Sequence, residues 1–514
     1  APVLPDLDHR DRWGLHPRAA YAALIAVVAV NALGGAGLPI GAALFFFPVS
    51  RSRLDPTTST TCGKPPAVIR SPWTPLIDAF GAAVAAVEPG ACVRRVLAVE
   101  SRPSSQPHIL AVGKAAIRMA QAAVKAVRDW EYDRAPGLVI AAEPGSVPGC
   151  EVLAGDHPVP GPASVHASEA IAAFIEQVPA GSPVWFLLSG GASSLMAAPE
   201  PPLTTSDLQE TFAVLLRCGL DIHAMNSVRK RITRWGGGRL GRALARVHVL
   251  QIVISDVIGD DLAAIGSGPC VPDPVDTPAV IARLREARAY DRLPAATRRL
   301  LTDMAEGRRA ETLKPGDSAL ERIRTVIAAT NTDARRAAAE YAKALDATVH
   351  LYSEPVQGEA SAAGRRLAAE LLETPGDEPV VHVWGGETTV TVTGDAGEGG
   401  RCQELALAAA EVLAGAGSRQ VALLAAGTDG RDGPTDAAGA LVDAGTWEAI
   451  GMAGHDPERA LERHDSYRAL ASAGALIRTG PTGTNVMDLM IASSGKDGVQ
   501  SLGHQRRTEL RYVS

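Results

Sequence analysis

The sequence predicts an α/β fold with two domains and mostly parallel sheets. Its 514 residues suggest two or three domains rather than one. From about Pro75 onward, short apolar runs alternate with alanine-rich stretches of helical periodicity, which is typical of β-α-β units. Almost every apolar run ends in glycine, serine or aspartate. Open α/β sheets bind ligands beyond the carboxyl ends of their strands, so we expect the chemistry to gather there.

The strands and helices are assigned from the spacing of apolar residues. Apolar residues at helical spacing predict helices in 114–130 (KAAIRMAQAAVKAVRDW) and in 166–178 (HASEAIAAFIEQV). Runs that are apolar at nearly every position predict buried strands. These predicted strands are 108–113 (HILAVG), 137–143 (GLVIAAE), 184–191 (VWFLLSGG), 247–256 (VHVLQIVISD), 325–330 (TVIAAT), 380–386 (VVHVWGG) and 421–430 (VALLAAGTDG).

We expect three segments: an N-terminal extension (1–70), a first domain (71–318) and a second domain with a tail (319–514). The polar stretch 311–322 (ETLKPGDSALER) contains a Pro-Gly turn and marks the division between the two domains. Within the extension, residues 19–50 carry no charge and are apolar enough to span a bilayer, although glycines and a proline interrupt them. They are either a membrane anchor or signal segment, or an extension that is disordered or is absent from the working protein.

Composition excludes several classes of protein. The net charge of −7 and the pI of 6.0 leave no basic surface for nucleic acid. The six cysteines form no Cys-x-x-Cys pair, so neither a zinc knuckle nor a redox motif is indicated. A reducing cytoplasm is the expected location.

A glycine and a lysine follow the first predicted strand. Gly113 allows a ligand to approach the backbone, and the helix that follows presents N–H groups and a partial positive charge to an anion. Lys114 adds a full charge there for a carboxylate or phosphate. The alternative is an ordinary surface lysine at a helix start.

Two other segments offer anion-binding groups. After the strand 184–188 comes a loop whose N–H and hydroxyl groups predict an anion nest, with a plain tight turn as the alternative; its members are Ser189, Gly190, Gly191, Ser193 and Ser194. The loop lacks the Gly-Lys-Ser/Thr ending of a Walker A motif. Arg229, Lys230 and Arg231 are adjacent and fan out on a helix. We expect at least one of them to face a cleft and the others to face solvent.

Carboxylates follow two of the predicted strands. Asp256, Asp260 and Asp261 come after the strand 247–256, and Asp429, Asp432 and Asp436 come after the last one. Such groups hold Mg²⁺, which prefers oxygen ligands and bridges to phosphates. One of them is otherwise suited to take a proton from a substrate hydroxyl. As caps and turn formers alone they also make sense.

The second half adds more polar groups beside glycine-rich turns. Arg401 precedes a predicted helix and is suited to clamp a carboxylate or phosphoryl group in bidentate fashion. Glu387, Thr428, Thr482, Thr484 and Asn485 lie in similar turns. Together these strand ends predict a cleft between the domains for a phosphorylated ligand, Mg²⁺ and a small acid.

A dinucleotide fingerprint is matched only formally. Gly236, Gly238 and Gly241 have the G-x-G-x-x-G spacing, but the true fingerprint follows an apolar strand. Here the glycines follow a basic stretch of helical character.

Read together, the motifs resemble the glycerate 2-kinase family, whose C-terminal domain is called MOFRL. The resemblance extends from about Pro75 to Ala492, in the family's order. Its strings are GKAA, DHPVP, LLSGGASSLM, NSVRK, GGGRL, ISDVIGDDLAAIGSGP, GGETTV, GGRCQELAL, AAGTDGRDGPTDAAGA and GPTGTNVMDL.

The resemblance implies ATP-dependent phosphorylation of D-glycerate at its 2-hydroxyl with a divalent cation, Mg²⁺. It also implies a Rossmann-like, mostly parallel N-terminal domain and a smaller C-terminal α/β domain facing each other across the site. Lys114 matches the lysine of GKAA and Arg401 the arginine of GGR, the positions usually proposed for the site. D-glycerate and ATP are the expected partners, no nucleic acid is expected, and a homo-oligomer is left open.

The implied roles cover a wider set of residues. Lys114 and Arg401 would hold the glycerate carboxylate and the γ-phosphoryl group, in either order, with Asp256 as the third catalytic group. Asp256 or Asp429 would organise Mg²⁺ or accept the hydroxyl proton. The substrate- and phosphate-binding candidates are Ser189, Gly190, Gly191, Ser193, Ser194, Asn226, Arg229, Lys230, Glu387, Thr428, Thr482, Thr484 and Asn485. The metal-binding candidates are Asp256, Asp260, Asp429 and Asp432.

The sequence departs from the family pattern at one position that bears on charge. Gly236 stands where the family usually has lysine, and Arg234 or Arg239 would have to compensate. Two other functions are therefore weighed. One is an NAD(P)H-dependent hydroxypyruvate reductase, a name that members of this family often carry. The other is a degenerate protein that binds glycerate or nucleotide without turnover.

Overall fold

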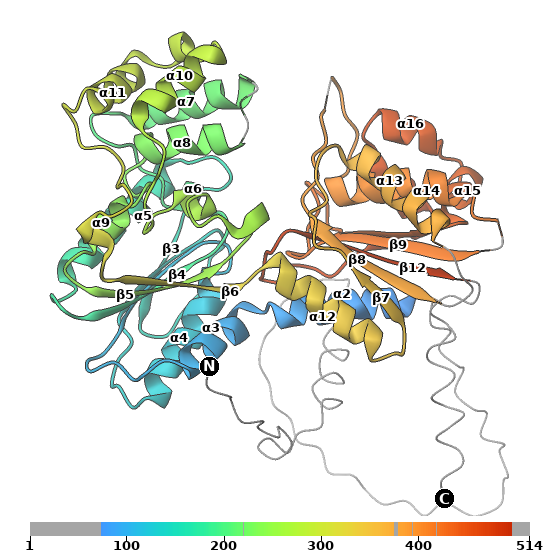
Figure 1. Cartoon of the computed structure of the whole chain (residues 1–514), viewed down its shortest axis with the longest axis horizontal. Coiled ribbons are helices and arrows are strands. Elements are labelled where there is room, and N and C mark those ends of the chain that lie inside the picture. The colour runs from blue at the N-terminus through green and yellow to red at the C-terminus, as the bar shows by residue number, and fades with distance from the viewer. Residues whose placement is uncertain are drawn as a thin grey trace, which may run out of the picture. The chain divides into compact units, whose positions relative to one another are not determined.

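Two six-stranded sheets with helices on both faces make up the part of the chain that the computed structural model describes (Figure 1). The described residues are 73–495, apart from 219, 221, 375–378, 393 and 418 and apart from the side chains of 216, 222 and 223. This arrangement confirms the predicted α/β fold with a Rossmann-like first domain and a second α/β domain.

The first sheet is parallel throughout and has the strand order β3-β2-β1-β4-β5-β6. Its strands are β1 (His108–Val112), β2 (Gly137–Ala141), β3 (Cys150–Ala154), β4 (Pro183–Leu188), β5 (His248–Ile254) and β6 (Ile323–Ala329). The order reverses between β1 and β4. At such a switch point the loops that leave the two strands diverge to opposite faces, and a crevice opens beyond the carboxyl ends.

Helices cover both faces of this sheet. One face carries α3 (Pro89–Ala98) and α4 (Ala116–Asp129), and the other carries α5 (Pro162–Gln177). In α4, Met119, Ala120, Ala123 and Val127 recur at helical spacing and are buried, so this stripe faces the sheet. The remaining short helices of this part are α6 (Ala192–Leu195), α9 (Arg239–Ala243), η1 (Ile258–Asp260), η2 (Ile265–Ser267), η3 (Tyr290–Arg292) and η4 (Ser318–Leu320).

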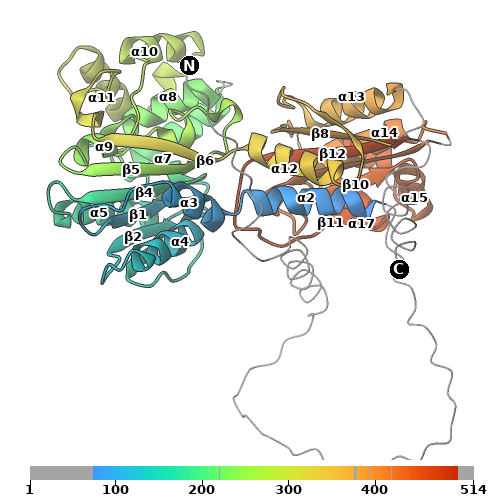
Figure 2. The same cartoon turned by 60° about the horizontal axis from the view of Figure 1, so that its bottom comes forward.

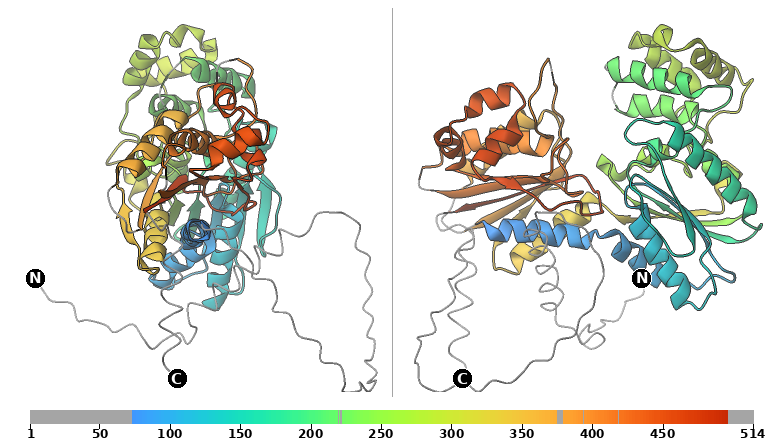
Figure 3. Two further views of the ribbon diagram at one scale, coloured as in Figure 1. Left: turned by 90° about the vertical axis from the view of Figure 1, so that its right-hand side faces the viewer. Right: turned by 180° about the vertical axis from the view of Figure 1, so that it is seen from behind.

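A separate helical cluster is inserted into the first domain and has its own apolar core (Figures 1 and 3). Leu208, Leu215, Ile232, Leu284 and Leu301 are buried in it. It consists of α7 (Thr205–Arg217), α8 (Ile222–Ile232), α10 (Thr277–Glu286) and α11 (Ala295–Ala305).

The second sheet is mixed, with the order β11-β10-β9-β12-β8-β7, and only β7 and β8 pair in parallel. The expectation of mostly parallel sheets therefore does not extend to it. One reason is β12, which the motif pattern presented only as a turn and which runs antiparallel between β8 and β9. The other is β10, which pairs antiparallel with β9 and β11. The strands are β7 (Thr348–Leu351), β8 (Val380–Gly386), β9 (Gln420–Gly427), β10 (Gly439–Asp443), β11 (Leu476–Ile477) and β12 (Asp488–Gly495).

Helices also sandwich the second sheet (Figure 2). α2 (Thr74–Ala86) and α12 (Asn331–Lys343) lie on one face, and α13 (Ala360–Glu373) and α14 (Arg401–Leu413) lie on the other. The short helices α15 (Thr446–Met452), α16 (Pro457–Glu462) and α17 (Ser466–Ser472) pack beside α14.

The chain crosses between the sheets more than once. α2 precedes the first sheet in sequence but packs on the second, where Trp73 Nε1 donates to Asp443 Oδ2 at 2.9 Å. One apolar cluster runs from the α3–α4 face of the first sheet to the α2–α12 face of the second. The predicted domain division at residues 318 and 319 stays a prediction. By strand pairing, however, the first sheet continues to Ala329.

Membrane insertion was predicted only for residues 19–50, which lie outside the described residues. Among the described helices, none alone is long and apolar enough to cross a bilayer. α2 and α3 meet that criterion only when taken as a pair, and they are bent by 47° at their junction.

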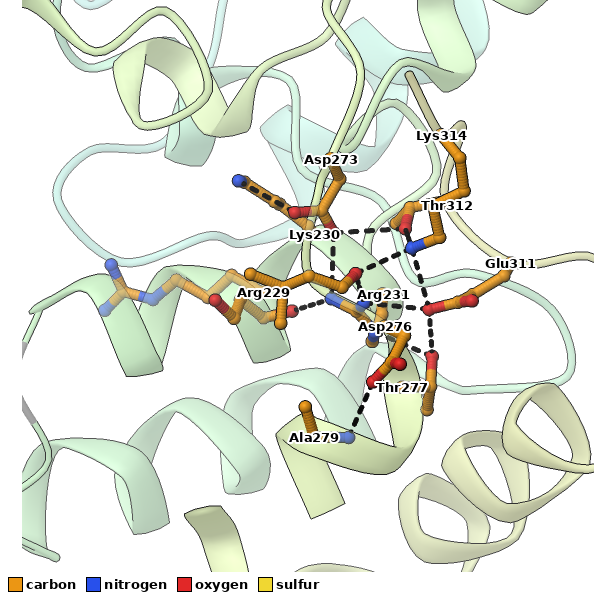
Figure 4. A network of polar contacts seen from close by, with 12 residues as sticks. Arg229, Lys230, Arg231, Asp273, Asp276, Thr277, Ala279, Glu311, Thr312 and Lys314 are labelled. Atoms are coloured by element: carbon orange, nitrogen blue, oxygen red, sulfur yellow. Dashed lines mark hydrogen bonds and ion pairs between the residues drawn. The ribbon is translucent and has the colours of Figure 1, made fainter. Parts of the chain in front are cut away.

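A buried ion network holds the helical cluster together (Figure 4). Asp273 is fully buried and lies 3.0 Å from Arg231 Nη1 and 3.4 Å from Lys230 Nζ. Arg231 also contacts Glu311 at 2.8 Å and donates through Nε to Thr277 at 2.8 Å. Lys230 and Arg231 therefore face neither a cleft nor solvent, contrary to the expectation for this basic run. A carboxylate brought from 42 residues away neutralises Arg231 instead.

Removing Asp273 should destabilise the fold strongly. Asp273→Ala leaves two buried cations without their shared carboxylate, and breaking such a pair costs about 3–5 kcal/mol. The matched control is Asp129→Ala, which removes an exposed partner of Lys125 and should cost at most about 1 kcal/mol. Urea unfolding measures both variants, and equal midpoints would contradict a structural role for the network.

Candidate active site

A cavity of about 800 Å³ lies where the two sheets present their strand ends. The first sheet contributes Lys114 after β1 and Asp256 after β5. The second contributes Glu387 after β8, Arg401 at the start of α14, and the loops next to β9 and β12. The predicted site residues that line the cavity are Lys114, Asp256, Glu387, Arg401, Asp429, Asp432, Thr484 and Asn485.

Lys114 is exposed in the cavity, and its Nζ makes no hydrogen bond or ion pair with any described residue. The serine loop fixes its backbone: the N–H of Lys114 donates to the Gly190 carbonyl at 2.9 Å. The N–H of Ala115 donates to Ser189 Oγ at 3.1 Å. Gly113 has φ +135°, and a Cβ there would overlap Ser189, so glycine is required for this close approach.

The serine loop supports the site without lining it. Ser193 shares a hydrogen bond with Ser267 at 2.8 Å, and Ser194 Oγ donates to the Gly191 carbonyl at 3.0 Å. With Ser189 bound to Ala115, each of these hydroxyls has a partner within the protein. None of the five loop residues predicted to bind phosphate belongs to the cavity lining.

Asp256 lies against the serine loop on the floor of the cavity. A Cβ at Gly190 would overlap its carboxylate, so only glycine leaves room there. Burial raises the pKa of Asp256; Asp429 adds to this rise and Lys114 opposes it. The result is a carboxylate more basic than an ordinary aspartate, next to a lysine.

Two carboxylates hold Arg401. Asp488, the first residue of β12, is 1% exposed and accepts from Nε at 2.6 Å and from Nη2 at 3.0 Å. Glu387 binds Nη1 at 2.8 Å. Burial alone would lower the pKa of the Arg401 guanidinium, but Asp488 and Glu387 raise it above its ordinary value. Arg401 is thus fixed in direction and always charged.

Glu387 is the less tightly held of these two carboxylates. It makes one contact with Arg401, whereas Asp488 makes two. Its side chain is 38% exposed and borders the cavity. Burial raises its pKa, with Asp488 and Asp256 adding to the rise and Arg401 and Lys114 opposing it.

Asp432 caps the N-terminus of α14. Its carboxylate accepts from the N–H of Cys402 at 3.0 Å and from that of Gln403 at 2.8 Å. These are donors that a helix N-terminus would otherwise offer to an anion. Burial raises the pKa of Asp432 to about 6, although the two N–H groups lower it. Asp432 therefore serves the helix that carries Arg401.

The predicted threonines bind the loops rather than the cavity. Thr428 Oγ1 donates to the Met487 carbonyl, and Thr482 Oγ1 donates to the Thr428 carbonyl, both at 2.6 Å. Thr484 Oγ1 donates to the Val87 carbonyl at 2.8 Å, at the junction of α2 and α3. Thr484 lines the cavity, but its hydroxyl ties the β12 loop to that junction.

No three acidic, histidine or cysteine side chains converge on a metal position within the described residues. Asp260 does not line the cavity, and Asp432 caps α14. Asp256 and Asp429 both border the cavity and interact electrostatically. Mg²⁺ is commonly held by one or two carboxylates together with phosphate oxygens. The two aspartates fit that arrangement, whereas a site built from protein ligands alone is not present in this region.

Three other predicted residues lie away from the cavity. Lys230 belongs to the buried ion network, and Arg229 stacks over Phe212 and donates to Asn226 at 3.3 Å. A Cβ at Gly236 would lie 2.9 Å from Lys230 Cα, so a lysine there would displace this chain's backbone.

Neither candidate for compensating Gly236 reaches the cavity. Arg239 donates to backbone carbonyls, and Arg234 stacks over Trp235. The glycines 236–241 follow the helix α8 rather than a strand, so they lack the setting of a dinucleotide fingerprint.

The sequence did not single out four residues that shape this site. Arg118, His157 and Arg431 line the cavity, and Asp488 holds Arg401. His157, Arg431 and Asp488 stand inside the quoted strings DHPVP, TDGRDG and GTNVMDL, which was the available signal. Arg118 carried none. Burial lowers the pKa of His157, and Lys114 lowers it further, so this ring is neutral at pH 7.

Comparison with known proteins agrees with the architecture. Residues 76–302 match a domain of unknown function, DUF4147, and residues 380–488 match the MOFRL family. A glycerate 2-kinase of Pyrococcus horikoshii is 34% identical over 392 residues, covering 75% of this chain and 86% of the relative. A protein of Agrobacterium vitis that bears the name hydroxypyruvate reductase is 38% identical over 423 residues, covering 80% and 92%.

Among solved structures, the crystal structure of a glycerate kinase from Thermotoga maritima superposes with a TM-score of 0.71 at 33% identity. It covers 82% of this chain and 98% of that one. Identity and coverage at these levels, over both domains, show that the chain belongs to the glycerate 2-kinase family.

Proposed function

We propose that this protein is an ATP-dependent kinase that transfers a phosphoryl group to the 2-hydroxyl of D-glycerate. The observation that carries the proposal is the cavity itself. It brings together Lys114, whose Nζ has no hydrogen-bond or ion-pair partner among the described residues, Asp256 with its raised pKa, and Arg401 held by Asp488. The relatives named for glycerate phosphorylation support the choice of substrate. The reductase alternative rests on the name of the Agrobacterium vitis relative. The fold does not support it, because the glycines at 236–241 follow the helix α8 rather than a strand.

Phosphoryl transfer asks the protein mainly for positioning and charge neutralisation. Lys114 and Arg401 supply positive charge from opposite sides of the cavity. Asp256 accepts the proton of the attacking hydroxyl, a role that its raised pKa favours. Glu387 completes the wall beside Arg401 and contacts the acceptor.

ATP and Mg²⁺ belong to the proposal as donor and metal. Asp429 would hold Mg²⁺ together with phosphate oxygens, and Asp256 stands within electrostatic range of it. When bound, the metal neutralises charge that develops on the phosphates. The free cysteines Cys92, Cys150, Cys218, Cys270 and Cys402 support a location in the reducing cytoplasm.

A product assay tests the function directly. The full chain, incubated with D-glycerate, ATP and Mg²⁺, should accumulate 2-phosphoglycerate, identified by ³¹P NMR. Lys114→Ala should lower kcat/KM about a hundredfold or more, because its charge has no substitute at that position. A folded wild-type protein without phosphorylated product would overturn the kinase proposal, and NADH oxidation with hydroxypyruvate would then be tested.

The rate should depend on the protonation of Asp256. A base must be deprotonated to act, so activity should fall as the pH drops through its pKa. Because that pKa is raised, the acidic limb of kcat should lie above the range of an ordinary aspartate. The charges of Lys114 and Asp429 act on the Asp256 carboxylate, and Asp256 in turn acts on Glu387. Asp256→Asn should abolish most activity and the acidic limb of kcat. A variant that keeps both the activity and the acidic limb would show that Asp256 is not the base.

Asp488 should matter for catalysis through Arg401. Asp488→Asn removes a buried charge from the Nε–Nη2 edge of the guanidinium, which lets Arg401 turn toward Glu387. We expect kcat/KM to fall about tenfold to a hundredfold. Glu411→Gln is the control, since it removes an exposed ion pair farther along α14. Similar kinetics for both variants would show that Asp488 does not position Arg401.

A further inference from the structure

The cations on the two sides of the cavity differ in how they are neutralised. On the side of the second sheet, Arg401 contacts two carboxylates and Arg431 lies 3.8 Å from Glu143. On the side of the first sheet, Lys114 and Arg118 form no ion pair or hydrogen bond through their side chains with any residue between 73 and 495 that the structure describes. Positive charge without an ion-pair partner among these residues is therefore concentrated where α4 begins.

Arg118 lies in the first turn of α4, and Lys114 lies in the turn that leads into this helix. Both side chains are exposed, and both border the cavity. Arg118 also reaches the loop before β12: Gly483 has φ +80°, and a Cβ there would overlap the Arg118 guanidinium. This contact directs the arginine across the mouth of the cavity.

Nothing in the first turn of α4 offsets this charge. The helix has no side-chain cap and no acidic residue in its first turn. Its partial positive end therefore adds to the two side chains. Lys114, Arg118 and this helix end all carry positive charge, so they favour a bound anion.

The number of cations selects the kind of anion. A single carboxylate presents one charged group, whereas a chain of linked phosphates presents several and can reach both Lys114 and Arg118. Building on the proposed function, we propose that Arg118 binds the polyphosphate of the nucleotide donor together with Lys114. The acceptor's single carboxylate is left to Arg401.

The contrast with Arg401 supports this division. The Nε–Nη2 edge of its guanidinium is occupied by Asp488, and the group is flanked by two negative charges. Such a guanidinium is suited to bind a singly charged anion and to orient it. Lys114 and Arg118 form no ion pair with a described residue, although Asp256 and Glu387 act on Lys114 through their charges. This pair of cations suits a polyanion.

The test compares Arg118→Gln with Arg118→Lys and with the control Arg128→Gln. Arg128 is exposed near the end of the same helix and does not line the cavity. Three constants are measured for each variant: the KM for ATP and the KM for D-glycerate in turnover, and the Kd for inorganic tripolyphosphate by competition with ATP in equilibrium dialysis. The Kd needs no catalysis.

Arg118→Gln should raise the KM for ATP and the tripolyphosphate Kd about tenfold, which corresponds to about 1.4 kcal/mol. The KM for glycerate should change less than about twofold, Arg118→Lys should recover part of the loss, and Arg128→Gln should behave as wild type. A rise confined to the KM for glycerate overturns the proposal. It is also overturned if neither the KM for ATP nor the Kd for tripolyphosphate changes. If the wild type forms no 2-phosphoglycerate yet binds tripolyphosphate through Arg118, the proposed function fails and the anion site stands.

Discussion

The bidentate contact between Arg401 and Asp488 is the interaction on which the second half of the site depends. Asp488 opens β12, the strand that joins β8 to β9 in the centre of the second sheet. All eight residues of β12 are buried, so the carboxylate cannot shift without moving the sheet. Arg401 starts α14 on one face of that sheet, and Asp432 fixes the same helix end. A charged side chain that would otherwise be mobile is thereby held in one direction.

The same strand end is tied to the connection between the sheets. Asn331, the first residue of α12 after β6, donates through Nδ2 to the carbonyls of Val486 at 2.8 Å and Asp488 at 3.0 Å. Thr484 binds the α2–α3 junction at Val87. Both places where the chain passes from one sheet to the other are thus bonded to the loop that precedes Asp488. The positions of Lys114 and Arg401 relative to each other depend on these contacts.

Hydroxyl groups and charged groups are used differently in this protein. The serines and threonines of the glycine-rich loops bond to backbone or to one another, and they shape the turns that carry the charged residues. The charged residues Lys114, Arg118, Asp256, Glu387 and Arg401 border the cavity instead. The absence of a lysine at Gly236 removes none of these charged residues from the cavity, because residue 236 packs on Lys230 away from it.

The sequence by itself determined five of the six strands of the first sheet, with β3 (Cys150–Ala154) as the exception, and the turns that carry Lys114, Asp256, Glu387 and Arg401. These signals are local, because a buried strand is apolar along its length and a ligand site forms where it ends. Only the tertiary structure decided which polar groups face the cavity. Lys230 pairs with Asp273, Asp432 caps α14, and Asp488 meets Arg401 from 87 residues away. The sequence did not indicate β12 or Arg118 for the same reason. The strands with which a strand pairs, and the ion-pair partners of a charged side chain, depend on residues distant in sequence.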